Sequence, residues 1–411
     1  MKILCIFGEH NYGDPDRGQS YEYANFIPTL RRLGHHVLFF ESWNRRTYKD
    51  FSDLNRQFLE TVEKEKPDII FYVLLGYEIW LETLDLVRKH CHAIAIHWST
   101  DDSWKYEQFS RFVAPAFDVY ATTSVPAVAK SQKDGHSNFV LTQWAANAEN
   151  LAEPLPAKEC RYRVSFIGSA YGNRPKWIEQ LRKQGIHVTC FGHGWPNGPV
   201  EAKEIPHIIR ESIISLNFGD SELMLRGVIP FRSRQIKARV FEVPGAGGFL
   251  MTEHAEGLEE YYAPEEEIIV FEGDSDLGEK IRYFLEHELE RDRIAWAGHL
   301  RTRNDHTYDS RFQHLLGVAS QGLASPVSRS DQENPYKIDM TKFAAVEASH
   351  RTGRLLKWVK KLLEWPCILV WGPHRGPRAA RRVLFEVSWR ILGRKTYTAS
   401  GLPGRLFYHE S

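Results

Sequence analysis

The sequence has little of what marks an extracellular or membrane-spanning protein. Its five cysteines are scattered, and no pair has metal-ligand spacing, so neither a disulfide framework nor a zinc site is expected. No apolar run reaches the roughly 18 residues that a membrane span needs. Met1 leads straight into an apolar stretch over 2–7, so we expect no secretory signal and a cytoplasmic protein in a reducing compartment.

The chain also lacks a net charge. The chain holds 53 Lys or Arg and 53 Asp or Glu, so no global field points to nucleic acid. The charge is unevenly spread, however. Residues 351–411 hold 13 Lys or Arg and 3 Asp or Glu, so residues 1–350 carry the opposite excess. Such a split is typical of a basic tail with an anionic partner, or of a solvated charged face.

Short apolar runs alternate with amphipathic stretches, which predicts parallel β-α-β units. In the first half, strands are expected over 2–7, 36–40, 68–73, 93–97 and 119–122, and helices over 21–32, 51–65 and 79–90. The polar, proline-containing stretch 147–159 is expected to be a linker, after which the pattern restarts. Strands are then expected over 164–167, 188–191, 213–217, 248–252 and 268–271, and helices over 175–184, 233–241, 277–287 and 291–305.

We therefore predict an α/β protein with two Rossmann-like domains, over 1–150 and 160–320. A basic, partly amphipathic extension over 321–411 follows, with a linker near 325–336. Two successive α/β domains commonly bind a ligand in the cleft between them.

The stretch 237–252, KARVFEVPGAGGFLMT, is the most informative part of the chain. Glycines permit close approach of another molecule to the backbone. Two cations suit a diphosphate, and a carboxylate suits the hydroxyls of a ribose. The residues concerned are Lys237, Arg239, Glu242, Gly245, Gly247 and Gly248. A helix C-cap followed by a core strand explains the same pattern.

Three segments carry a resemblance to a known family: 239–253 (RVFEVPGAGGFLMTE), 258–287 and 297–312 (AGHLRTRNDHTYDSRF). Weaker echoes lie at 97–104 (HWSTDDSW) and 164–174 (VSFIGSAYGNR). Over residues 1–319 the chain resembles the CgeB-like, spore-maturation type glycosyltransferases, relatives of the group 1 retaining glycosyltransferases. This resemblance implies a GT-B fold, with a C-terminal domain for a nucleotide-sugar donor and an N-terminal domain for the acceptor.

The resemblance also implies roles for individual residues. Glu242 and Gly247 match the Glu-x4-Gly element whose carboxylate binds the donor ribose. An earlier glutamate of the larger group is replaced by Arg234. Gly168 and Arg174 resemble a diphosphate element in which Ser169 replaces one cation, so Lys237 or Arg239 is expected to substitute for it.

Glycosyl transfer without a metal needs cations at the departing diphosphate, and Arg174 and Arg239 suit that task. His97 ends a predicted strand, and the resemblance places a histidine near the donor sugar; a core histidine is the alternative. Asp101 or Asp102 would orient or deprotonate an acceptor hydroxyl, or else cap the next helix.

No metal and no other cofactor are expected. The triplet Asp14-Pro15-Asp16 predicts a turn, and Asp274-Ser275-Asp276 predicts a helix N-cap. His193-Gly194-Trp195 either flanks the nucleotide base or forms a plain turn.

The sequence thus predicts a metal-independent, retaining hexosyltransferase that uses a nucleotide-sugar donor and a glycan or lipid-linked acceptor. A non-catalytic nucleotide-sugar or glycan binding protein and a GT-B epimerase are the alternatives. Leucines, Trp358 and Val359 alternate with lysines over 355–363. This pattern predicts attachment of 351–411 to an anionic inner membrane face, or packing of that segment on the N-terminal domain.

Overall fold

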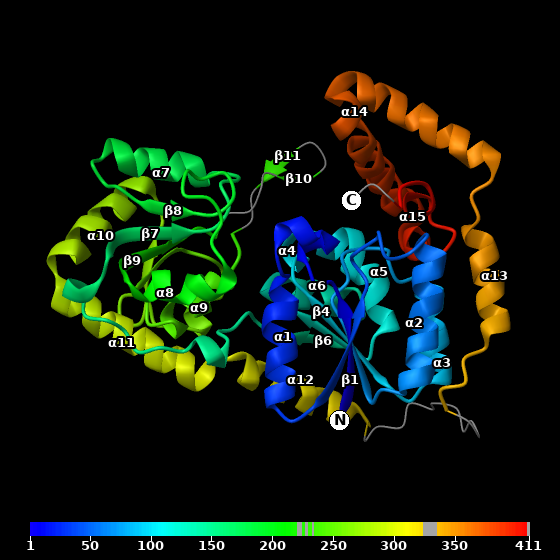
Figure 1. Ribbon diagram of the computed structural model, residues 1–411, viewed down its shortest axis with the longest axis horizontal. Helices are drawn as coiled ribbons and strands as arrows, with labels where there is room; N and C mark the ends of the chain where they lie inside the picture. Colours follow the sequence, from blue (N-terminus) through cyan, green and yellow to red (C-terminus); the bar gives the residue numbers. More distant parts are fainter. Residues whose placement is uncertain (220–223, 227–228, 232–233, 324–334, 409–411) are drawn as a thin grey trace. The chain divides into compact units, whose positions relative to one another are not determined.

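The computed structural model describes residues 1–219, 224–226, 229–231, 234–323 and 335–408 (Figure 1). The chain divides into two compact units. Unit 1 comprises Met1–Thr142 and Leu315–Ser411, and unit 2 comprises Gln143–His314. The predicted boundary near 150 therefore lies several residues too late, and the predicted separate extension is part of unit 1.

Unit 1 contains a six-stranded, fully parallel sheet in the order β2-β1-β3-β4-β5-β6. Five of its strands lie where the apolar runs predict them. The sixth has only three residues, all of intermediate burial, and gives too short a pattern to detect. The strands are β1 Lys2–Phe7, β2 His36–Glu41, β3 Ile69–Tyr72, β4 Ile94–Ser99, β5 Val119–Thr122 and β6 Phe139–Leu141.

The first two helices of unit 1 begin at side chains that satisfy free backbone N–H groups. Ser20 Oγ accepts from Tyr23 N at 3.1 Å, and Asp50 Oδ1 accepts from Asp53 N at 3.0 Å. These local signals explain why the bounds of both helices match the prediction. The helices after each strand are α1 Tyr21–Arg32, α2 Phe51–Glu65, α3 Leu81–His90, α4 Asp102–Lys105, α5 Arg111–Val113 and α6 Val125–Lys133.

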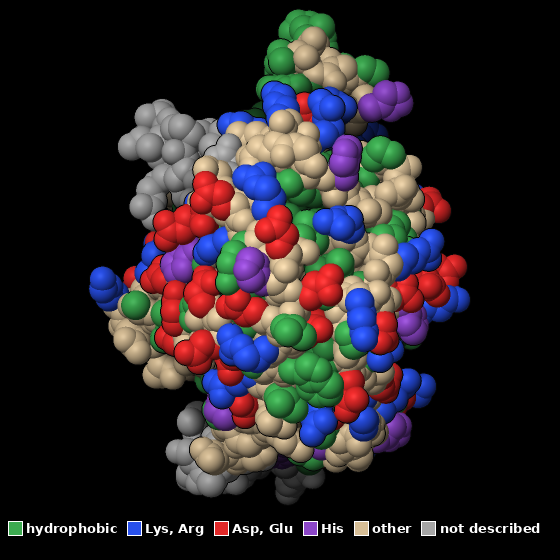
Figure 2. Space-filling view, turned by 90° about the vertical axis from the view of Figure 1, so that its left-hand side faces the viewer, with side chains coloured by type: hydrophobic (Ala, Val, Ile, Leu, Met, Phe, Trp, Pro, Cys, Tyr) green, Lys and Arg blue, Asp and Glu red, His purple; other side chains and the backbone are tan. Residues whose placement is uncertain are grey.

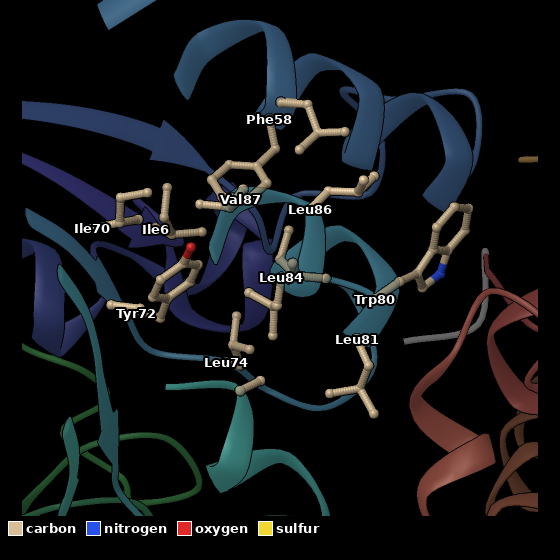
Figure 3. Packing of buried hydrophobic residues seen from close by; sticks show 14 of the residues in the cluster. Ile6, Phe58, Ile70, Tyr72, Leu74, Trp80, Leu81, Leu84, Leu86 and Val87 are labelled. Atoms are coloured by element: carbon tan, nitrogen blue, oxygen red, sulfur yellow. The ribbon is translucent and has the colours of Figure 1, made fainter. Parts of the chain in front are cut away.

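One face of this sheet is covered by α2 and α3, and the resulting core is shown in Figure 3. Phe58 from α2 and Leu84 and Val87 from α3 point toward Ile70 and Tyr72 of the sheet. All five side chains are almost fully buried, and each such apolar side chain stabilises the fold by about 1.5–3 kcal/mol relative to exposure.

The chain returns to unit 1 after 314 and completes this core. The later helices are α13 Met340–His350, α14 Arg354–Leu392 and α15 Leu402–Leu406. Phe343 stacks on the buried Trp80 ring at 6.3 Å between centroids. Tyr408 donates its hydroxyl to the Arg45 carbonyl at 2.7 Å. Packing on the N-terminal domain, one of the two expectations for the tail, thus accounts for its inner face.

Unit 2 contains a five-stranded, fully parallel sheet in the order β13-β12-β9-β7-β8. Its strands are β7 Tyr162–Ile167, β8 Thr189–Phe191, β9 Ser212–Asn217, β12 Leu250–Glu253 and β13 Ile269–Phe271; Met224–Arg226 (β10) and Ile229–Phe231 (β11) form a separate antiparallel pair. Its helices are α7 Arg174–Lys183, α8 Ile205–Arg210, α9 Arg239–Gly245, α10 Asp274–Glu286 and α11 Glu288–Asp305, and α12 Tyr308–Leu323 continues into unit 1.

The helix predicted over 233–241 is wrong in its bounds. Residue 233 lies outside the described residues, and α9 begins only at Arg239. The backbone N–H of Gln235 donates to Gly219 O at 2.9 Å, which holds this segment against the chain after β9. A contact 16 positions away in sequence leaves no local signal.

The predicted linker 147–159 is an integral part of unit 2. Ala152 N donates to Gly245 O at 3.1 Å, and Ala157 N donates to Asp292 Oδ1 at 3.0 Å. Arg291, which is fully buried, donates to Leu155 O at 2.9 Å. These bonds tie the segment to α9 and α11.

The two sheets share one strand order. In each, the first strand lies between the second and the third, so successive connections leave the first strand in opposite directions. Ligands of open α/β sheets bind beyond the carboxyl ends of the strands at such a switch point. The relevant places are the ends of β1 and β3 in unit 1 and of β7 and β9 in unit 2.

Candidate functional site

The turn after β7 is the centre of the candidate site in unit 2. Gly168 follows the strand directly, and a Cβ there would lie 2.9 Å from Phe166 Cζ and 3.3 Å from Arg174 Nη1. Its carbonyl accepts from Trp195 Nε1 at 2.7 Å, and its N–H donates to Phe191 O at 2.9 Å. The turn is therefore held on both sides by the segment after β8.

Arg174 is the first residue of α7 and lies against this turn. Its Nη1 donates to Ser169 O at 3.1 Å, and its guanidinium lies 4.2 Å from the centroid of the Tyr171 ring. A cation beside the first turn of a ten-residue helix is a favourable place for a phosphate, because the helix dipole adds partial positive charge there.

Arg239 brings a second cation to the same strand end. Its Nε donates to Ile167 O at 3.4 Å, and its Nη1 pairs closely with Glu242 Oε2 one turn along α9. Lys237 precedes them, and its Nζ bonds the side-chain oxygen of Gln235. Four of the predicted donor residues, Gly168, Arg174, Arg239 and Glu242, are thus linked through residues 167–169.

Gly247 and Gly248 receive a different explanation from the predicted one. A Cβ on Gly247, whose φ is +80°, would lie 2.6 Å from Ala152 O, and one on Gly248 would lie 2.6 Å from Ile209 Cγ2. Their N–H groups donate to Pro244 O and Val243 O. At both positions the close approach is to the chain's own linker and to α8, and a role toward a donor stays a prediction.

Arg234, at the position where the resemblance implies a glutamate, pairs with a carboxylate from another element. Its Nε lies 3.1 Å from Oε1 of Glu253, which ends β12 and is buried. A buried carboxylate costs free energy unless it is paired, so this arginine stabilises the end of β12.

The segment 297–312, part of the strongest resemblance, packs against α9. A Cβ on Gly298 would lie 2.3 Å from Glu267 O, and His299 Nδ1 lies 3.1 Å from Pro244 O. Burial lowers the pKa of His306 to about 4, and its Nε2 lies 2.7 Å from Tyr261 O. A neutral imidazole with this partner is a packing element, so the segment fixes α9 in place.

In unit 1, His97 lies within the sheet core. Its side chain is 1% exposed, its ring stacks on Tyr120 at 4.6 Å, and its Nε2 lies 3.4 Å from Leu74 N. Burial lowers the pKa of His97 to about 3, so it is neutral at physiological pH. The alternative of a core histidine describes this position, and its role toward a donor sugar stays a prediction.

Asp101 and Asp102 have opposite environments. Asp102 is buried and accepts hydrogen bonds from the hydroxyls of Ser99 (2.6 Å) and Ser110, and burial raises the pKa of its carboxyl. The Asp101 side chain is more than a third exposed and lies 3.7 Å from Lys105 Nζ. Of the two, only Asp101 presents a carboxylate that an acceptor hydroxyl can reach.

The sequence reasoning missed Glu22, in the first turn of α1. This side chain is buried, and burial, with a further contribution from the Asp101 charge, raises the pKa of Glu22 to about 7, while Lys105 acts in the opposite direction. Its sequence signal was ordinary, since acidic residues are common in a first helical turn. Only its burial distinguishes it.

Each acidic triplet contains an aspartate with a local partner. Asp14 accepts from Asp16 N at 3.3 Å and pairs with Arg17 at 3.3 Å, which is the predicted turn. Asp276 accepts from Glu272 N at 3.1 Å at the start of α10. Among the described residues, no group of three or more His, Cys, Asp or Glu side chains is arranged to hold a metal ion.

Comparison with known proteins agrees with this architecture. Residues 174–317, about a third of the chain, match the family described as glycosyl transferase-like. No curated protein matches the chain. Sucrose-phosphate synthase from Thermosynechococcus elongatus is structurally similar, with a TM-score of 0.57 and 11% identity over 79% of this chain and 100% of that one.

Two further structures are similar. A glycosyltransferase from Rickettsia africae has a TM-score of 0.55 and 13% identity over 79% of this chain and 99% of that one. HepE from Anabaena, solved in complex with UDP, has a TM-score of 0.52 and 11% identity over 78% of this chain and 100% of that one. The predicted GT-B fold is confirmed, and residues 174–317 are similar to a glycosyl transferase-like family. The narrower CgeB-like resemblance stays a prediction.

Proposed function

We propose that the protein transfers a sugar from a nucleotide-sugar donor, bound at the carboxyl edge of the unit 2 sheet, to a glycan or lipid-linked acceptor. The observation that carries this proposal is the convergence of Arg174 and Arg239 on residues 167–169. Two permanent cations beside the switch point suit a leaving diphosphate. The match of residues 174–317 to a glycosyl transferase-like family supports it, as does the UDP bound to structurally similar HepE.

In this proposal Glu242 has two partners in turn. It pairs with Arg239 in the structure, and a bound nucleotide would place its ribose hydroxyls at this carboxylate while the diphosphate takes Arg239. In the bound state the Glu242 carboxylate accepts hydrogen bonds from the ribose hydroxyls, and the Arg239 guanidinium pairs with the diphosphate. Neither charged group is therefore left without a polar partner.

On the acceptor side, Asp101 is the residue we favour to orient or deprotonate a hydroxyl. It is more than a third exposed, it lies beyond the end of β4, and its carboxylate lies 3.7 Å from Lys105 Nζ. We further propose that transfer is metal-independent, since arginines supply the positive charge, and that it retains the anomeric configuration, as the resemblance implies.

The competing function is a nucleotide-sugar binding protein without catalysis. Arg234 favours it, because the position implied to hold a glutamate carries a cation committed to Glu253. Turnover decides between the two, since both predict nucleotide binding and only the enzyme releases free nucleotide from the donor.

Isothermal titration calorimetry with UDP, GDP and ADP, followed by the matching nucleotide-sugars, tests the donor site. Arg174→Ala should weaken binding of the preferred nucleotide roughly tenfold, about 1.4 kcal/mol. The matched control is Arg182→Ala on the same helix, because that side chain is exposed and pairs only locally with Glu179 at 2.8 Å. Equal losses in both variants, or no binding of any nucleotide by the intact protein, would refute the donor site.

A further inference from the structure

The first arm of α14 carries an apolar face that no described residue covers. A break at Gly372, with φ +77° and ψ 171°, divides α14 into two arms. The inner face of the first arm packs into a small core that contains Leu356, Leu363 and Cys367 together with Leu406 and Phe407 near the chain's end. This contact fixes which side of the arm points away from unit 1.

On the opposite side runs a row that we call the outer stripe. Its members follow one another at intervals of three, four, three and four residues, the spacing of one helix face. Each is between 64% and 79% exposed. The outer stripe consists of Leu355, Trp358, Leu362, Trp365 and Leu369.

Basic residues flank the outer stripe. Lys357 and Lys361 are exposed and lie along one side of it by helical spacing, as does Arg354 at its start. From 351 to 382 the chain holds nine Lys or Arg and a single acid, Glu364, which lies 3.5 Å from Lys360 Nζ. In Figure 2, hydrophobic side chains lie beside Lys and Arg at the top, the height at which Figure 1 draws the turn of α14.

We propose that the outer stripe lies in the interface of a lipid bilayer that contains anionic lipids. Leucines enter the boundary of the acyl chains, tryptophans prefer the headgroup level, and the flanking lysines and Arg354 meet the lipid phosphates. No helix among the described residues is long and apolar enough to cross a membrane, which agrees with a helix that lies on the surface.

Charge favours a membrane over a protein. The cores of protein interfaces are depleted in lysine, whereas interfacial helices combine lysines with tryptophan and leucine. A second copy of this chain on the outer stripe would bring Lys357 and Lys361 against their own equivalents. An anionic bilayer instead neutralises every one of these charges.

Co-sedimentation of the full chain with vesicles tests the proposal. Vesicles of phosphatidylcholine with 30% phosphatidylglycerol (about one anionic lipid in three, enough to create a negative surface potential) are compared with pure phosphatidylcholine. The full chain should bind the anionic vesicles at least tenfold more tightly, with binding lost at high salt. Truncating the tail is unsuitable, because Phe343 and Tyr408 complete the unit 1 core.

Two pairs of variants separate the apolar and ionic contributions. Trp358→Gln with Trp365→Gln should weaken binding at least tenfold, whereas Leu289→Gln, an 88% exposed position on α11, should not. Lys357→Glu with Lys361→Glu should abolish the preference for anionic vesicles, whereas Lys133→Glu with Lys183→Glu, at exposed positions near the ends of α6 and α7, should preserve it. Unchanged circular dichroism and nucleotide affinity exclude misfolding and keep this test separate from the donor site.

Three results would overturn the proposal. The first is that the intact chain fails to bind anionic vesicles at low salt. The second is that the double variant Trp358→Gln with Trp365→Gln binds as tightly as the intact chain. The third is self-association without lipid, seen by sedimentation velocity and lost in the tryptophan pair, which would make the outer stripe an interface between copies.

Discussion

Unit 1 and unit 2 have the same strand order but use their ionisable residues differently. At the strand ends of unit 1, His97, Asp102 and Glu22 are buried, and each has a pKa displaced by burial toward its neutral form. At the β7 end of unit 2, Arg174 and Arg239 bind backbone carbonyls and keep part of their guanidinium surfaces open.

This difference shows that position at a strand end does not by itself make a residue available to a ligand. Unit 1 buries His97, Asp102 and Glu22, and it leaves the Asp101 carboxylate more than a third exposed. Unit 2 places its cations on the first residues of helices, where each donates to a backbone carbonyl at or just after the end of β7. Changes in unit 1 should therefore affect stability first, and changes in unit 2 should affect binding first.

The largest effect is expected from Trp80→Ala in unit 1. Trp80 is buried and stacks on Phe343, so truncation leaves a large cavity and should destabilise unit 1 by about 3–5 kcal/mol. Denaturant unfolding measures the loss, and calorimetry should show that nucleotide affinity is unchanged. A parallel fall in affinity would contradict the division of roles between the units.

Glu22→Gln tests the comparison through the pH dependence of the stability of unit 1. The pKa of Glu22 is about 7 in the folded protein and about 4.5 when it is exposed, so the folded state holds its proton more tightly. The stabilisation that this tighter proton binding gives the folded state is fully present below pH 4.5, and it is lost as pH rises through 7.

Glu22→Gln removes this dependence, because glutamine does not ionise. At pH 8 the variant should be more stable than the intact protein by up to about 3 kcal/mol, and at pH 4 the two should be nearly equal. Urea unfolding at both pH values measures the difference. A variant that is less stable by the same amount at both values would show that the carboxyl acts by packing alone.

Glu242→Ala tests unit 2. Loss of a charge-assisted hydrogen bond to the ribose should weaken nucleotide binding by roughly 1.5–3 kcal/mol, with the fold intact. Titration calorimetry gives the affinity, and Glu179→Ala on α7 is the control because this half-exposed side chain pairs with Arg182 on its own helix. Unchanged affinity in the Glu242 variant would rule out the ribose assignment.

The smallest effect is expected from chelation. If the arginines of unit 2 provide the positive charge, EDTA should leave nucleotide binding and turnover within error. A loss that manganese restores would replace the arginine-based donor site by a metal-dependent one.

Local signals explain which parts of the fold could be predicted. The helices after Ser20 and Asp50 begin where their caps require, and β1 and β5 coincide with uninterrupted apolar runs. The start of α9 was missed because Gln235 bonds to Gly219, and β6 was missed because three residues give no periodicity. Backbone contacts between distant segments have no signature in a single sequence.

Arg239 and Glu242 were singled out by residue type, and Arg174 by the family resemblance. The structure brings all three to residues 167–169, and their role toward a donor stays a prediction. The closeness of the Ala152 carbonyl to Gly247 and the burial of Glu22 could not be anticipated. Residue type indicates what a side chain can do, whereas only the fold decides whether it faces outward.

The split composition of unit 1 has a consequence for synthesis. A chain leaving the ribosome completes unit 2 once His314 has emerged, whereas the strands of unit 1, made earlier, still lack Phe343 and Tyr408. Until then Trp80 and Phe51 have no cover from the late helices. The first-made half is thus the last to be finished, and nascent unit 1 is the natural client of chaperones that hold exposed aromatic surface.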